Sequence, residues 1–237
     1  MARSRAALAA LVMLMLAPAG TGWAEGASYL PKVKLDGAVF LGPPPAADSP
    51  RQQSDLATVR AWQAEKDGSR WRQAQSDDNI SPFTAFGSVL GPQFTPERLP
   101  KTKALFEVLF DDVKSVTAPA KVAFGRPRPP LVDKGIKTCQ PLEQTASYPS
   151  GHAARGWMMA LVLSEMAPER ANALLARGRD YGESRVVCAE HFPSDVEAGR
   201  LVGAAVATAA ERDPRFRQDF AEARAEVRAA LGLPAAP

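Results

Sequence analysis

Histidine and cysteine are scarce in this 237-residue chain, which has two of each. Two cysteines cannot supply the four thiolates of an all-cysteine zinc site, so that class of site is excluded. The chain also lacks a large excess of charge of one sign, because it contains 29 Lys and Arg and 26 Asp and Glu. Arg3 and Arg5 lie in an N-terminal segment without acidic residues, and the remainder is nearly neutral. The charge therefore gives no indication of binding to nucleic acid or to an anionic membrane.

Long apolar runs are scarce as well, and the most pronounced one lies at the N-terminus, over residues 6–17. A helix of that length spans about 18 Å, well short of the roughly 30 Å of a hydrocarbon core. Arginines precede the run, and Gly22 and Ala24 supply the small residues of a cleavage site. The pattern predicts a signal peptide over 1–24, export to the periplasm, and a mature domain over 25–237 with no membrane anchor. An uncleaved anchor is the alternative.

The expected export bears on the oxidation state of the two cysteines, Cys139 and Cys188. An oxidising compartment permits disulfides, so we expect the pair to be bonded. The alternative is two buried free thiols, because spacing along the chain does not establish disulfide geometry.

Patterns typical of β-strands are almost absent, and apolar residues recur at helical spacing from Asp55 onward. A second helical run around Trp71 ends at a break over 77–79. The longer expected helices cover residues 99–125, 153–166, 169–186 and 215–231, and another begins at Pro193 and Ser194. Residues 126–150 are rich in proline and lack a sustained period, which is typical of a long functional loop. The sequence predicts an all-α helical bundle with long functional loops.

Two segments carry groups suited to holding a phosphate. Lys121, Arg126 and Arg128 lie where a helix runs into the long loop, and arginine presents a planar fork of donors that matches an oxyanion. Ser150 and Gly151 stand at the start of the next helix, where free backbone amides and the helix dipole favour an anion. Taken singly, the first pattern is also typical of a solvated basic helix end.

A third segment contains one of the two histidines. His191 and Asp195 are four residues apart at the entry to a helix, a spacing that can place the carboxylate against one imidazole nitrogen and leave the other free. Arg185 ends the preceding helix. The other histidine, His152, follows Gly151 directly. An isolated histidine is usually a packed core residue, but here both histidines occupy such positions.

Together the three segments resemble the signature of the type 2 phosphatidic acid phosphatase superfamily, K-x6-R-P, P-S-G-H and S-R-x5-H-x3-D. The chain reads Lys121-x6-Arg128-Pro129, Pro149-Ser150-Gly151-His152 and Ser184-Arg185-x5-His191-x3-Asp195. Within the superfamily it is most similar to the secreted bacterial class A nonspecific acid phosphatases, over essentially the whole mature chain. Ala153 and Phe192 stand where those enzymes usually have Thr and often have Trp, which bears on substrate preference.

The resemblance implies a fold of the acid phosphatase and vanadium haloperoxidase type, and hydrolysis of diverse phosphomonoesters without a cofactor or metal. It makes His191 the nucleophile that forms a phosphohistidine, Asp195 its orienting partner, and His152 the proton donor and later base. The residues expected to hold the phosphoryl oxygens are Lys121, Arg128, Ser150, Gly151 and Arg185. Arg126 lies outside the signature and is expected behind these residues.

Two other functions fit parts of this pattern. A haloperoxidase would use the same pocket to hold vanadate as a cofactor, but those enzymes resemble this family only over a core within a much longer chain. A periplasmic oxyanion-binding protein would use the basic cluster without needing histidines at catalytic spacing. The expected partners are small-molecule phosphomonoesters, with transfer of the phosphoryl group to an alcohol as a further activity. Nucleic acid is not expected, and a homo-oligomer is left open.

Overall fold

The computed structural model describes residues 28–30 and 35–235, and the regular structure within these ranges is entirely helical. The predicted all-α architecture is confirmed. The elements are α1 (Gly37–Phe40), α2 (Pro50–Gln63), α3 (Ser69–Ser76), α4 (Pro82–Leu90), α5 (Pro100–Phe124), α6 (Pro129–Val132), α7 (Gly151–Met166), the 3₁₀ turn η1 (Pro168–Arg170), α8 (Ala171–Val187), α9 (Pro193–Ala210) and α10 (Pro214–Ala230). The expected signal peptide over 1–24 lies outside the described residues. Within the described ranges, no helix combines the length and apolar character needed to cross a membrane.

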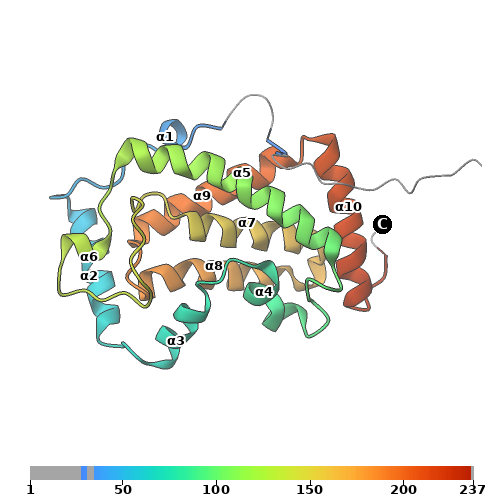
Figure 1. Cartoon of the computed structure of the whole chain (residues 1–237), viewed down its shortest axis with the longest axis horizontal. Coiled ribbons are helices and arrows are strands. Elements are labelled where there is room, and N and C mark those ends of the chain that lie inside the picture. Colours follow the sequence, from blue (N-terminus) through green and yellow to red (C-terminus); the bar gives the residue numbers. More distant parts are fainter. Residues whose placement is uncertain (1–27, 31–34, 236–237) are drawn as a thin grey trace, which may run out of the picture.

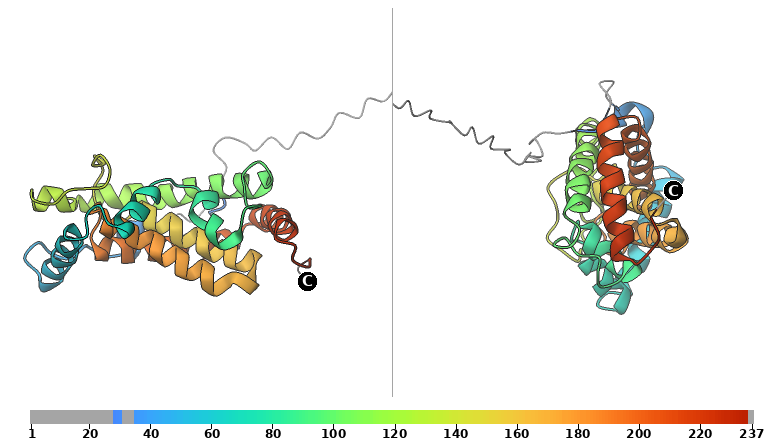
Figure 2. Two further views of the ribbon diagram at one scale, coloured as in Figure 1. Left: turned by 90° about the horizontal axis from the view of Figure 1, so that it is seen from below. Right: turned by 90° about the vertical axis from the view of Figure 1, so that its right-hand side faces the viewer.

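Helix α7 lies at the centre of an elongated bundle (Figure 1). It packs against α8 and α9, while α5 runs along one side of the molecule. Helix α10 packs on α5 at one end (Figures 1 and 2). The core between them is apolar and includes Leu109, Met158 and Val202, which are fully buried. At the opposite end from α10, the C-terminal ends of α5 and α8 meet the N-terminal ends of α7 and α9 (Figure 1).

Helices α9 and α7 approach so closely that a side chain at either of two positions on α9 would force the helices apart. A Cβ atom added at Gly199 would lie 2.4 Å from the backbone oxygen of Ser150, and one added at Gly203 would lie 2.3 Å from that of Ala154. The contact sets the position of the first turn of α9, which carries Asp195, relative to the start of α7.

Proline accounts for most of the differences between expected and observed helix bounds. Helix α2 begins at Pro50 rather than at Asp55, and α4, which the sequence analysis missed, begins at Pro82. Both helices are capped by the serine before the proline, whose side chain accepts a backbone N–H of the first turn. Proline fits the first turn because its missing N–H has no partner there anyway. Pro168 likewise begins the short turn η1 before α8.

Candidate active site

All eight residues that the sequence singled out lie where the four helix ends meet. Lys121 is in the last turn of α5, Arg185 is in the last turn of α8, and Arg128 lies in the loop after α5. Ser150, Gly151 and His152 form the start of α7; His191 precedes α9, and Asp195 lies in its first turn. Backbone hydrogen bonds join the segments, including Ser150 N to Asp195 O at 3.0 Å and His191 N to Arg185 O at 3.2 Å.

His191 and Asp195 form a buried pair. The Nδ1 atom of His191 lies 3.5 Å from Oδ2 of Asp195, and the Ser147 hydroxyl lies 3.3 Å from the same nitrogen. Ser147 also donates to Asp195 Oδ2 at 2.6 Å, and the backbone N–H of Phe192 donates to that oxygen at 2.8 Å. Nδ1 is thus held on the carboxylate side, which leaves Nε2 without a hydrogen-bond partner among the described residues. A neutral imidazole held this way presents Nε2 as the nucleophilic nitrogen.

Arg126 supports this pair from behind. Its guanidinium donates to Asp195 Oδ1 at 2.5 Å and to Asp55 Oδ2 at 3.0 Å, and all three side chains are buried. It also lies over the Phe192 ring, 4.4 Å from the ring centroid. Arg126 thus lies behind the His191 and Asp195 pair. Its second carboxylate partner, on α2, was not foreseen.

His152 is held through Nε2, whereas His191 is held through Nδ1. Its Nε2 lies 2.6 Å from the backbone oxygen of Asp77, and its ring stacks on that of Tyr181 with centroids 5.0 Å apart. A carbonyl can only accept, so Nε2 carries a proton and Nδ1 is the atom that gains or loses one. The Asp77 carboxylate is itself fixed by Arg177 and Ser184. This arrangement orients Nδ1 of His152 as a proton donor or acceptor.

Burial keeps both histidines neutral in the free protein. It lowers the pKa of His191 below its ordinary 6.5, and the neighbouring Asp195 only partly offsets this effect. Burial also lowers the pKa of His152 well below 6.5, with the positive charge of Arg185 as the next cause. The pKa of Asp195 lies below its ordinary value despite its burial, because His191 and Arg126 favour the carboxylate. His191 is therefore unprotonated even in mildly acidic solution.

The predicted phosphate-binding cations surround the histidines. Lys121 donates from Nζ to the backbone oxygen of Ala146, and burial lowers its pKa to about 8. Arg128 is 1% exposed and pairs with Glu190 at 2.9 Å and Glu143 at 2.5 Å. Arg185, equally buried, donates to Asp78 at 2.9 Å, and its Nε has no partner among the described residues. The unused Nε donor of buried Arg185 is what an incoming oxyanion needs, whereas the nitrogens of Arg128 are all engaged by Glu143, Thr145 and Glu190.

The start of α7 supplies neutral donors. The Ser150 hydroxyl oxygen accepts from Ala153 N at 3.3 Å, which leaves its own proton free to be donated. The backbone N–H of Ser150 is taken by Asp195, so the first free amide of the helix is that of Gly151. A phosphate at this point would also meet the positive end of the helix dipole.

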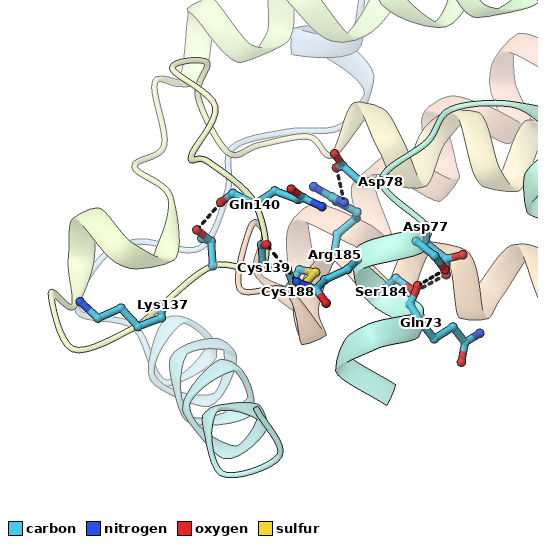
Figure 3. The surroundings of a disulfide bond; sticks show 12 residues. Gln73, Asp77, Asp78, Lys137, Cys139, Gln140, Ser184, Arg185 and Cys188 are labelled. Atoms are coloured by element: carbon cyan, nitrogen blue, oxygen red, sulfur yellow. Dashed lines mark hydrogen bonds and ion pairs between the residues drawn. A yellow bond between two sulfur atoms is a disulfide. The ribbon is translucent and has the colours of Figure 1, made fainter. Parts of the chain in front are cut away.

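A disulfide fastens the long loop to this end of the bundle (Figure 3). Cys139 and Cys188 are bonded, with Cα atoms 4.9 Å apart, and Cys139 N donates to Cys188 O at 3.3 Å. The predicted pairing is confirmed. Cys188 directly follows α8, and Figure 3 places Arg185 and Asp78 beside the bridge.

Several residues around the site escaped the sequence analysis. These are Asp55, Asp77, Asp78, Glu143, Ser147 and Glu190. Their partners lie up to 139 residues away in the chain, and an isolated carboxylate in a polar stretch carries no sign of burial. Ser147 was within reach of the analysis, because it lies three residues before Ser150. Tyr148, which directly precedes Pro149, packs edge-on against Phe124 with centroids 5.3 Å apart.

Comparison with known proteins agrees with this geometry. The PAP2 superfamily model matches residues 104–219, which span the site. The non-specific acid phosphatase of Salmonella typhimurium is 37% identical over 208 residues, covering 84% of this chain and 83% of the relative. That of Providencia stuartii is 32% identical over 201 residues, covering 81% of each. This chain belongs to the non-specific acid phosphatases of the PAP2 superfamily. The family inferred from the signature is confirmed.

The fold of this acid phosphatase family member is similar to that of a peroxidase. The first bacterial vanadium-dependent iodoperoxidase superposes with a TM-score of 0.58 at 18% identity, covering 73% of this chain. This chain spans about half of that protein, 52% of its length, and the likeness concerns the fold alone. The predicted fold type is confirmed. In the part of the chain that the structure describes, no group of three or more His, Cys, Asp or Glu side chains is arranged to hold a metal ion.

Proposed function

We propose that this acid phosphatase is exported, hydrolyses diverse phosphomonoesters, and does so through a phosphohistidine at His191. The observation that carries the proposal is the pair of oppositely oriented histidines. His191 is tied at Nδ1 to a carboxylate, and His152 is tied at Nε2 to a carbonyl. Each is left with one free nitrogen beside the same cluster of cations. An oxyanion-binding protein has no use for that arrangement, because binding alone needs only the cations.

The first step forms a bond between phosphorus and Nε2 of His191 while the bond from phosphorus to the ester oxygen breaks. The leaving oxygen takes a proton from Nδ1 of His152, and Asp195 stabilises the positive charge that develops on His191. In the second step water gives a proton to Nδ1 of His152 and attacks phosphorus. The bond to His191 breaks, and inorganic phosphate leaves. An alcohol that takes the place of water would receive the phosphoryl group.

Lys121, Arg128, Arg185, the Ser150 hydroxyl and the Gly151 amide surround the place of the phosphoryl group. Cations and fixed dipoles around a transferring phosphoryl group stabilise charge in the transition state. They supply what a divalent metal supplies in other phosphatases. Exhaustive treatment with EDTA should therefore leave the activity intact, and vanadate should inhibit, because it mimics the pentavalent transition state. Restoration of a chelated, inactive enzyme by a divalent ion would contradict metal independence.

The low pKa of His191 is consistent with catalysis at acidic pH, because the nucleophile stays neutral there. His152 must carry a proton when the ester breaks, although its pKa in the free protein is low. A bound phosphate dianion would raise that pKa by offsetting the charge of Arg185, the second cause of its depression. Protonation of His152 is thus coupled to substrate binding.

Substituting each histidine separates the two roles. His191→Ala should abolish release of phosphate from every monoester. His152→Ala should slow alkyl phosphates by roughly 100-fold or more, the loss typical of missing acid catalysis, but spare the first step with p-nitrophenyl phosphate. Phenolate leaves without a proton, so labelled phosphoenzyme should accumulate on His191 after acid quench. Equal losses on both substrates, with no trapped phosphoenzyme, would refute the assignment.

Export is the remaining part of the proposal. It rests on the signal-like N-terminal segment and on the Cys139 to Cys188 disulfide, since such bonds persist in oxidising compartments. Fractionation of cells should recover the activity with the periplasm, and the N-terminal sequence of the purified protein should begin after Ala24. An intact N-terminus on cytoplasmic enzyme would overturn it.

A further inference from the structure

One cation beside the site has no partner among the described residues. Arg155 lies on α7, and its guanidinium makes no hydrogen bond or ion pair with any residue that the structure describes. The other arginines of this region each pair with at least one carboxylate: Arg126 with Asp55 and Asp195, Arg128 with Glu143 and Glu190, Arg177 with Asp77, and Arg185 with Asp78. Arg155 is partly buried, and a partly buried arginine without an anion beside a substrate site points to a ligand.

The guanidinium of Arg155 reaches back toward the start of α7. A Cβ atom built on Gly151 would lie 3.8 Å from Arg155 Nη1 and 3.8 Å from the Thr117 hydroxyl. Helical side chains lean toward the N-terminus of their helix, so a residue four positions after Gly151 covers that first turn. On its other side the guanidinium lies over the Phe110 ring, 5.9 Å from the centroid. Arg155 thus lies between α5 and the amide end of α7.

This place is on the leaving-group side of the proposed reaction. Arg155 follows His152 by three residues, and residues at that spacing are neighbours on a helix surface. His152 donates its proton to the leaving oxygen, on the opposite side of phosphorus from His191. The phosphoryl oxygens already have donors in Lys121, Arg128 and Arg185. A further cation next to His152 is therefore placed for a different part of the substrate.

We propose that Arg155 is a specificity-determining residue that binds a second anionic group, a carboxylate or phosphate, on the leaving group of the substrate. The inference rests on the proposed phosphatase function, because it uses the placement of phosphorus between the two histidines. Burial lowers the pKa of Arg155 from its ordinary value, with Tyr181 and Asp111 opposing that effect. The other titratable groups facing this region are Lys121, His152 and Glu143. The guanidinium stays charged at any working pH.

Matched phosphonates test the proposal without turnover. 3-Phosphonopropionate and propylphosphonate share the phosphonate group, and only the first carries a carboxylate at the far end. Calorimetry measures the dissociation constants of both phosphonates for the unaltered full-length protein and for Arg155→Met. The carboxylated ligand should bind roughly 10-fold to 100-fold more weakly to the variant, as expected for loss of a charge-assisted hydrogen bond. Propylphosphonate should change by less than about 3-fold.

Arg224→Met is the control for lost charge. Arg224 lies on α10 at the other end of the molecule and stands over Phe220 with its guanidinium 5.7 Å from the ring centroid, much as Arg155 stands over Phe110. That variant should leave both dissociation constants unchanged. Arg155→Lys should retain part of the preference, and thermal unfolding of each variant checks that it is folded.

Two results would overturn the proposal. Equal weakening of both phosphonates would mean that Arg155 binds the phosphoryl group itself, and unchanged binding of both would mean that it binds neither. The hydrolysis of 2-phosphoglycolate and ethyl phosphate by the unaltered enzyme is measured in parallel. Failure to hydrolyse either ester would contradict the proposed function, whereas a changed ratio of phosphonate affinities would still support the binding role of Arg155.

Discussion

The contact between α9 and α7 allows a prediction with a magnitude. Gly199→Ala places a Cβ atom 2.4 Å from the oxygen of Ser150, whereas real Cβ atoms essentially never approach a heavy atom within 3.0 Å. Neither partner is a flexible side chain, so the helices must separate by at least about half an ångström. Overpacking of this kind costs about 1–3 kcal/mol. Alanine recovers up to about 1 kcal/mol of helix propensity over glycine, which leaves a net loss of up to about 2 kcal/mol in most of this range.

Gly203→Ala meets a similar obstacle one turn further along, 2.3 Å from the oxygen of Ala154. The two variants should therefore lose similar stability, and thermal unfolding should occur roughly 2–8 °C lower in each. Their activities should differ. Gly199 lies over Ser150, whose N–H holds the backbone of Asp195, so separation there moves the two halves of the site apart. A misplacement near 1 Å can cost roughly 100-fold in rate.

The assay combines unfolding followed by circular dichroism with kcat/KM for p-nitrophenyl phosphate. Gly87→Ala is the matched control, since nothing lies within 4 Å of a Cβ atom at that position in α4. It should keep full activity, and its free energy of unfolding should rise by up to about 1 kcal/mol. The reasoning is wrong if Gly199→Ala has the unfolding temperature and kcat/KM of the unaltered enzyme. It is also wrong if Gly203→Ala loses as much activity as Gly199→Ala.

Three further predictions follow from the site. Arg126→Met leaves the buried Asp195 carboxylate without its arginine and Asp55 with only the half-exposed Arg51, and it should lower the free energy of unfolding in urea by about 3–5 kcal/mol. Lys103→Met, which breaks an exposed pair with Glu107, should cost less than about 1 kcal/mol, and equal losses would argue against the assigned role. Burial and the neighbouring Arg128 lower the pKa of Lys121 to about 8, so its charge is present below that pH and lost above it. KM should therefore be flat below about pH 8 and rise above it, and Lys121→Arg should remove the rise; a profile identical in both enzymes would count against it. The Cys139→Ala and Cys188→Ala double variant should lose about 4 kcal/mol of stability, the value for closing a loop of this length in the chain-entropy model, and mass spectrometry of the unaltered protein should find no free thiol.

The helices that the sequence predicted well are those with periodic apolar faces. The expected ranges for α5, α7 and α10 end within two residues of the observed bounds, because long amphipathic stretches leave little choice of face. Helix α4 was missed because its short sequence, with the polar stretch before it, shows no sustained period. Ser81 and Pro82 mark its start by cap chemistry alone.

The chemical groups of the site were predictable, but their surroundings were not. His191, His152 and the signature cations stand in fixed local patterns, so a resemblance could find them. Asp55 and Glu190 act through tertiary contacts, and their burial depends on how α2 and the end of α8 pack. Arg155 gives no signal either, because an arginine on a helix usually faces water. What sets it apart is its place beside the start of α7 without an ion pair to any described carboxylate, which only the three-dimensional structure reveals.

The convergence of four helix ends has a consequence for how the protein acquires its activity. Lys121 and Asp195 are 74 residues apart in the chain, so the site exists only after distant segments have met. Isolated helices form in about a microsecond, whereas long-range closure of a topology of this size is much slower. Recovery of helical signal during refolding should precede recovery of phosphate release. The catalytic assay therefore reports on the last stage of folding.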